Sequence, residues 1–254
     1  MKNIGVIYRH EIFLLMISPS TYFAGFLFLS LFWFLYTWHI LPTLPSEDLP
    51  TTSLFQYFWI PVIFMVPLLT MKTLAEERRL GTLETLLTTP TTTATIVLGK
   101  FGAAYTVYLV LWLLALSYPV LSHLEIPEGR TNFNFLDPAP LLGGYLFIAI
   151  SGTMHIAAGI FASSLTRSQL VASLLSFGIL FIIVLGEYAL FPQIEVPKTM
   201  AENWRLTLDY LSTFRHLEDF SRGILDSRPF ILYLTSTSVF LGGAILMIEQ
   251  KANR

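Results

Sequence analysis

The side chains that could carry chemistry are few in this 254-residue chain, and their spacing matches no catalytic or metal-binding pattern. His10 directly precedes Glu11, and His216 lies two residues before Glu218, but neither arrangement has the spacing of a metal-ligand set. The absence of cysteine excludes thiolate ligands, disulfides and cysteine nucleophiles. A phosphate-binding loop with the spacing G-x-x-x-x-G-K-[ST] is also absent. We therefore expect no catalytic, cofactor-binding or metal site in this chain.

Four small or polar residues, Ser151, His155, Gly159 and Ser163, recur at every fourth position of one apolar segment. This spacing places them on one face of a helix. Small side chains let two helices approach closely, and hydroxyl or imidazole groups form hydrogen bonds between helices. The pattern indicates a helix-packing face, and contact with a transported substrate is the alternative.

The segment Lys72–Pro90 combines an apolar stripe with charges of both signs. Its leucines recur at intervals of three and four residues, which predicts a helix over 73–88 with one apolar face. Gly81 falls in the interior of this expected helix, where glycine costs about 1 kcal/mol relative to alanine. We interpret the segment as a helix that docks onto a partner protein, and a solvated loop is the alternative. The charged residues of the expected helix over 73–88 are Glu76, Glu77, Arg78, Arg79 and Glu84.

The composition predicts that most of the chain crosses a membrane. Hydrophobic residues make up 54% of the chain and charged residues only 13%, about half the charged share of a soluble domain. Six charge-free runs of at least 19 residues are present, and about 20 apolar residues in a helix span a bilayer. The sequence therefore predicts an all-α membrane protein with six transmembrane helices, near 20–41, 54–71, 95–122, 140–164, 168–190 and 229–248.

The distribution of Lys and Arg predicts the orientation of these helices. If both termini lie inside the cell, nine of the 15 basic residues fall in inside segments and six in outside segments. Five of the outside residues belong to one long loop before the last span. Because short inside loops are enriched in Lys and Arg, we expect both termini in the cytoplasm. A net charge of −2 gives no basic surface for nucleic acid.

Two further segments are predicted to be helical. Ile4–Ile17 is either an amphipathic helix in the membrane interface, ended by Pro19, or an extension of the first span. The stretch 201–227 has apolar residues at intervals of three and four from Trp204 to Ile224. We expect an external helical segment that packs on the outer mouth of the bundle or lies on the outer membrane surface.

The run Pro67–Pro90, PLLTMKTLAEERRLGTLETLLTTP, resembles the signature of ABC-2 type permeases, the membrane subunits of a class of ATP-driven exporters. The order of the expected elements is similar to that family over the whole chain. Within the family, the tail His216–Arg228, HLEDFSRGILDSR, is similar to the gliding-motility-associated permease (GldF type). The opening Tyr8–Phe13 is similar as well, whereas Leu217 and Pro229 depart from that group's pattern.

The resemblance implies a division of labour between several chains. A cytoplasmic ABC ATPase dimer would bind ATP and Mg²⁺, while this chain would hold no cofactor and would pair with a second permease chain. An external accessory protein and the lipids of the inner membrane complete the expected partners. The alternative from another class is a membrane scaffold or an intramembrane enzyme that uses His155 and His216. The implied ATPase-coupling residues are Glu76, Glu77, Arg78, Arg79, Gly81, Thr82 and Glu84, with Arg167 in a smaller second contact.

Overall fold

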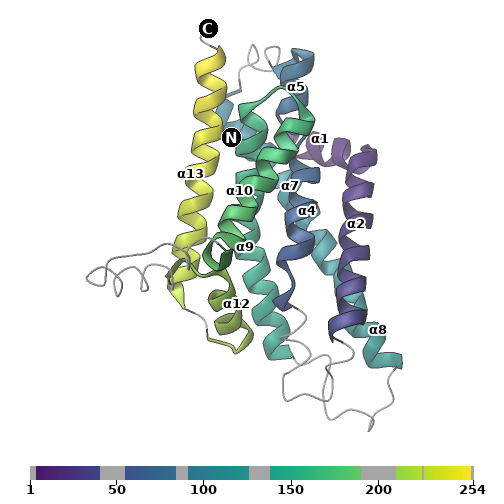
Figure 1. Cartoon of the computed structure of the whole chain (residues 1–254). Coiled ribbons are helices and arrows are strands. Elements are labelled where there is room, and N and C mark those ends of the chain that lie inside the picture. Colours follow the sequence, from purple (N-terminus) through teal and green to yellow (C-terminus); the bar gives the residue numbers. More distant parts are fainter. Residues whose placement is uncertain are drawn as a thin grey trace, which may run out of the picture.

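The computed structural model describes residues 4–40, 55–83, 91–125, 138–189, 210–224 and 226–252, and every regular element in these ranges is a helix. Six helical segments are long and apolar enough to cross a membrane, and they form one bundle (Figure 1). The chain is thus an all-α, multi-pass membrane protein, which confirms the predicted fold class. The six spans are built on α2 (Pro19–Leu35), α4 (Trp59–Thr70), α7 (Thr93–Ala115), α9 (Pro138–Leu165), α10 (Gln169–Ala189) and α13 (Ser227–Ala252).

The shorter helices lie toward the two ends of this bundle (Figure 1). α1 (Ile4–Ile17) and α5 (Ala75–Leu80) lie toward the end at which α13 finishes. α8 (Ser117–Glu125) and α12 (Thr213–Ser221) lie toward the opposite end. The chain therefore gathers its N-terminal helix, its charged helix α5 and the end of its last helix on one side of the spans.

A proline separates α1 from the first span. Ser18 leaves the helical conformation, with φ −70° and ψ 122°, and Pro19 occupies the first turn of α2. Proline has no backbone N–H, so it is tolerated at the start of a helix but breaks a continuous one. α1 therefore crosses the end of the bundle against α7 instead of extending α2 (Figure 1). Of the two predicted arrangements, the separate helix is the one observed.

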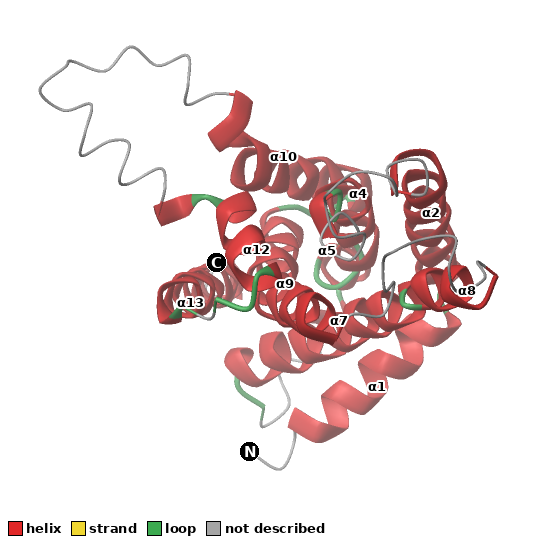
Figure 2. Cartoon of the chain, turned by 90° about the horizontal axis from the view of Figure 1, so that it is seen from below, coloured by secondary structure: helices red, strands yellow, loops and turns green. Residues whose placement is uncertain are grey.

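α9 is the central helix of the bundle (Figure 2). It packs against α4, α7, α10, α12 and α13, and Ile156, Ala157 and Ile160 have no exposed surface. Its small residues let neighbours come very near. A Cβ atom on Gly143 would lie 1.9 Å from the carbonyl oxygen of Phe220 on α12. The sequence of α9 thus permits backbone contact where a larger side chain would hold the helices apart.

α12 packs beneath α9 at its end of the bundle. Ser212 caps the helix, since its Oγ accepts a hydrogen bond from the Arg215 amide at 3.2 Å. Leu217 and Phe220 are buried against the bundle. α12 therefore packs against α9 at one end of the bundle.

A single helix over the whole of 201–227 is not observed. α12 ends at Ser221 because Gly223 adopts φ 78°, a left-handed conformation that terminates helices. The part of the prediction that covers residues 201–209 lies outside the described residues, as does its position 225.

The contact between α9 and α12 gives a first prediction. Gly143→Ala should push α12 away from α9, because the new methyl group would overlap the Phe220 carbonyl. Overpacking costs about 1–3 kcal/mol, so the unfolding temperature of the purified protein in detergent should fall by roughly 5 °C. Gly178→Ala in α10 is the control, because nothing lies within 4 Å of that position. Equal unfolding temperatures for the two variants would contradict the close approach.

Candidate functional site

The start of α5 is capped by a side chain from α9. Leu74, the residue before α5, has no side-chain acceptor of its own. Ser163 supplies one, since its Oγ accepts hydrogen bonds from the amides of Leu74 at 3.2 Å and Ala75 at 3.0 Å. The same hydroxyl donates to the Met71 carbonyl at 3.2 Å. The first amides of a helix have no partner within it, so α9 fixes where α5 begins.

Two further residues of the Ser151–Ser163 stripe, Gly159 and His155, lie toward α4. A Cβ atom on Gly159 would lie 2.3 Å from Oγ1 of Thr70, the last residue of α4. The ring of His155 lies 6.4 Å from the ring of Phe58, which precedes α4. The structure therefore brings His155, Gly159 and Ser163 to the contact between α4 and α9, close to the start of α5.

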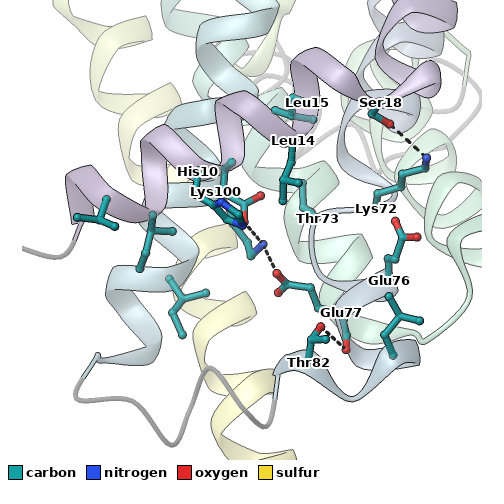
Figure 3. A pocket seen from close by; sticks show the side chains of 15 residues that line it. His10, Leu14, Leu15, Ser18, Lys72, Thr73, Glu76, Glu77, Thr82 and Lys100 are labelled. Atoms are coloured by element: carbon teal, nitrogen blue, oxygen red, sulfur yellow. Dashed lines mark hydrogen bonds and ion pairs between the residues drawn. The ribbon is translucent and has the colours of Figure 1, made fainter.

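A buried ion cluster holds α5 to two other helices. Lys100 of α7 is only 2% exposed, and its Nζ lies 2.6 Å from Glu11 Oε1 of α1 and 2.7 Å from Glu77 Oε1 of α5. Glu11 is itself 8% exposed. Three elements far apart in the sequence thus meet at one ammonium group (Figure 3).

The charges of this cluster do not balance within the described residues. Two carboxylates face one ammonium, and Glu77 Oε2 is buried without a hydrogen-bond partner there. Removing an ion from water costs several kcal/mol, which short contacts to opposite charges offset. Loss of Lys100 would leave both carboxylates uncompensated, so this residue determines whether α1 and α5 can stay where they are.

α7 is shaped to receive α1 beside this cluster. Gly99 precedes Lys100, and a Cβ atom there would lie 2.7 Å from Cγ2 of Ile7. Further along α7, the Thr106 hydroxyl lies 2.9 Å from the Tyr8 hydroxyl. The glycine lets α1 approach closely enough for the short Lys100 and Glu11 side-chain contact to form.

Arg78 fastens α5 to the end of α9. Its guanidinium donates a hydrogen bond to the Ser164 carbonyl, close to the C-terminal end of α9, where the helix dipole favours a cation. Arg167 follows in the short connection to α10 and is exposed. The two predicted coupling residues therefore lie near the α9–α10 connection.

The sequence predicts Gly81 in the interior of a helix, but the structure places it at the end of α5. It has φ 72° and ends α5 directly after Leu80. Glycine is favoured in this left-handed conformation because it has no Cβ atom. The expected uninterrupted helix over 73–88 is therefore wrong at this position, and Glu84 lies outside the described residues.

Two residues of α5 lie opposite to what its amphipathic pattern predicts, which is an exposed charged side and a buried apolar side. Glu77 turns inward to Lys100, whereas Leu80 is 62% exposed. Glu76 and Arg79 form an exposed pair at 3.7 Å, of the kind that adds little stability. With Thr82, which is also exposed, these residues form the outer surface of α5.

A groove separates α1 from α5. It has a volume of about 660 Å³ and opens beside the ion cluster (Figure 3). Its walls mix apolar side chains with Lys72, Glu76 and Glu77.

Of the histidines singled out by the sequence, His10 is exposed, whereas His155 and His216 are buried in different settings. Both ring nitrogens of His155 lack hydrogen-bond partners among the described residues, as does the Ser151 hydroxyl one turn away. His216 Nδ1 lies 3.1 Å from the Tyr233 hydroxyl. Burial lowers the pKa of His216 below its usual range, although Asp219 and Asp226 oppose this shift. Within the described ranges, no group of three His, Asp or Glu residues could hold a metal ion.

Sequence reasoning missed the ion cluster. The sequence assigns no contact to Lys100, which lies within α7. One sequence feature could have indicated a buried, paired lysine. Lys100 is the one charged residue of α7 and lies between Gly99 and Gly102. No sequence pattern connects it to Glu11, which is 89 positions away.

The fold and this site define a polytopic membrane protein with a short, internally anchored helix at one end of its spans. The profile of the family described as ABC-2 family transporter protein matches residues 50–214. The chain belongs to this family and is a permease of an ABC transporter. A comparison with curated proteins finds no match.

The ion cluster gives a second prediction. Lys100→Met should lower the unfolding temperature by roughly 10 °C, since breaking a buried ion pair costs about 3–5 kcal/mol. The substitution should also increase the mobility of α5, because α5 loses its contact with α7. Since the chain has no cysteine, a spin label attached to Arg79→Cys measures that mobility without labelling any other site.

Two variants make this experiment specific. The triple variant Glu11→Gln, Glu77→Gln and Lys100→Met should recover most of the loss, because it leaves no buried charge. Lys72→Met should leave the unfolding temperature unchanged, since Lys72 has no ion pair among the described residues. A Lys100→Met protein that unfolds at the wild-type temperature would contradict the role of the cluster.

Proposed function

We propose that this permease couples ATP hydrolysis by a separate ABC ATPase subunit to export, or to mechanical transmission, across the membrane. The family already implies association with an ABC ATPase. The observation that supports α5 as the coupling helix is its attachment to α7 through Lys100 and to α9 through Ser163 and Arg78. A force applied to α5 would reach α7 and α9 directly, and it would reach α1 through the contact of Lys100 with Glu11.

The outer surface of α5 is proposed as the docking surface for the ATPase. Arg79, Leu80 and Thr82 are exposed there, whereas Glu77 is occupied by Lys100 and the half-buried Glu76 faces the groove. We assign Arg167 to a second contact, because it is exposed near Arg78 at the α9–α10 connection. Glu84 remains a predicted member of this surface. ATP and Mg²⁺ would be bound by the ATPase and not by this chain.

We further propose that two permease chains enclose the pathway and that the complex belongs to the gliding-motility-associated (GldF type) group. The group assignment depends on the opening and tail motifs, with their departures at Leu217 and Pro229. The complex would reside in the inner membrane with both chain termini in the cytoplasm. This orientation is supported by the grouping of α1, α5 and the end of α13 on one side of the bundle (Figure 1).

Topology labelling provides the third prediction. Epitope tags before Met1 and after Arg254 should resist protease added to intact spheroplasts, because nine of the 15 basic residues lie on the side of the termini. A tag inserted at Lys198 should be cleaved under the same conditions. Cleavage of the C-terminal tag would reverse the proposed orientation and remove α5 from the cytoplasm.

Docking provides the fourth prediction. Leu80→Glu should reduce recovery of the ATPase about tenfold, because it places a charge at an apolar contact. The permease is co-expressed with an adjacent reading frame that carries G-x-x-x-x-G-K-[ST], and co-purification of the two proteins is measured.

The matched control is Ile224→Glu, which changes a similarly exposed apolar residue near α12, toward the opposite end of the bundle. It should leave recovery unchanged. Equal recovery from Leu80→Glu and wild type, with both permeases fully inserted, would contradict docking through α5.

A further inference from the structure

The groove between α1 and α5 has the character of a binding site for an amphipathic molecule. Its volume of about 660 Å³ is within the range of small-ligand pockets. Val6 and Leu14 of α1 provide an apolar wall, and Leu80 of α5 and Ile96 of α7 provide another. Charged side chains of both signs lie between these walls.

Two charged side chains of the groove, Lys72 and Glu76, do not neutralise each other. They lie four residues apart and both line the groove, yet no ion pair joins them. The Lys72 ammonium instead donates a hydrogen bond to the Ser18 hydroxyl at 3.3 Å (Figure 3). Among the described residues, Glu76 has a single ion-pair contact, at 3.7 Å, with the exposed Arg79.

Three carboxylates (Glu11, Glu76 and Glu77) and two ammonium groups (Lys72 and Lys100) line the groove, with His10 beside them. Glu77 and Glu11 share the ammonium of Lys100, so Glu76 is the groove carboxylate without a lysine partner among the described residues. A cation entering the groove would be attracted to Glu76. A phosphate would be attracted to the other charged position, at Lys72 and Ser18.

The groove opens along a helix that presents apolar side chains outward. Val6 is 70% exposed and lines the groove, and Phe13 and Ile17 are exposed further along α1. In a multi-pass membrane protein, such a surface is covered by lipid when it lies at the bilayer boundary. An acyl chain could therefore follow the α1 wall into the bilayer while the headgroup stays among the charges.

We propose that this groove binds one phospholipid with a primary ammonium headgroup, phosphatidylethanolamine. Its ammonium would donate a hydrogen bond to the Glu76 carboxylate, and its phosphate would accept from Lys72 and Ser18. A quaternary ammonium, as in phosphatidylcholine, has no N–H to donate. An anionic headgroup without an amine gives Glu76 no cationic partner. The site thus selects a zwitterionic lipid with a donating amine.

The test uses the purified, delipidated permease alone, so its outcome is independent of coupling to an ATPase. Native mass spectrometry measures the binding of phosphatidylethanolamine, phosphatidylcholine and phosphatidylglycerol. Phosphatidylethanolamine should bind about tenfold more tightly than phosphatidylcholine, since hydrogen bonds between charged groups are the strong ones. Glu76→Gln should remove this preference, while Lys72→Met should weaken both zwitterionic lipids.

Two further variants separate the site from general effects on the protein. Leu14→Trp should abolish specific binding by filling the groove without changing a charge. Glu218→Gln, which changes an exposed carboxylate on α12, is the matched control and should bind as the wild type does. Equal affinity for the three lipids, tightest binding of phosphatidylglycerol or an unchanged preference in Glu76→Gln would overturn the proposal.

Discussion

A single buried ammonium group controls the arrangement of this end of the molecule. Lys100 lies in an apolar helix, and its charge can be tolerated there only because carboxylates from α1 and α5 reach it at 2.6 and 2.7 Å. The energetic cost of leaving any member unpaired makes the three helices depend on one another. α1 and α5 are short and could not hold a fixed position through their own hydrogen bonds. Their placement is therefore a property of the bundle.

The same end of the bundle is held by polar contacts of a second kind. Ser163 and Arg78 both bind backbone groups that have no partner within their own helix. The Ser163 hydroxyl accepts hydrogen bonds from the first amides of α5, and the Arg78 guanidinium donates one to a carbonyl near the end of α9. These bonds connect α5 to the helix that occupies the centre of the structure. The proposed coupling function depends on this property, because a docking helix that could move independently would transmit nothing to the spans.

The two ends of the bundle are built with different chemistry. At the end of α12, contact depends on shape. Gly143 has no side chain, so the backbone of α12 lies directly against α9, and Leu217 and Phe220 are buried. At the end of α5, contact depends on charge, and a groove lined by Lys72 and Glu76, which form no ion pair with each other, lies beside it. A charged end near a lipid headgroup layer is suited to partners that exchange, whereas an apolar end is suited to permanent packing.

The sequence by itself determined the six spans, the all-α class and the family, because long charge-free runs and the Pro67–Pro90 motif are local properties that need no knowledge of neighbours. It also placed Ser151, His155, Gly159 and Ser163 on one helix face. It could not predict which side of α5 faces the bundle. Local amphipathicity predicts an exposed Glu77 and a buried Leu80, whereas Glu77 points inward because its carboxylate binds Lys100, 23 residues away. Gly81 was misplaced for a related reason, since its left-handed φ depends on where α5 must stop. Only the tertiary structure decided these positions, because a buried charge is stabilised by whichever opposite charges the fold brings to it, and sequence separation carries no information about that.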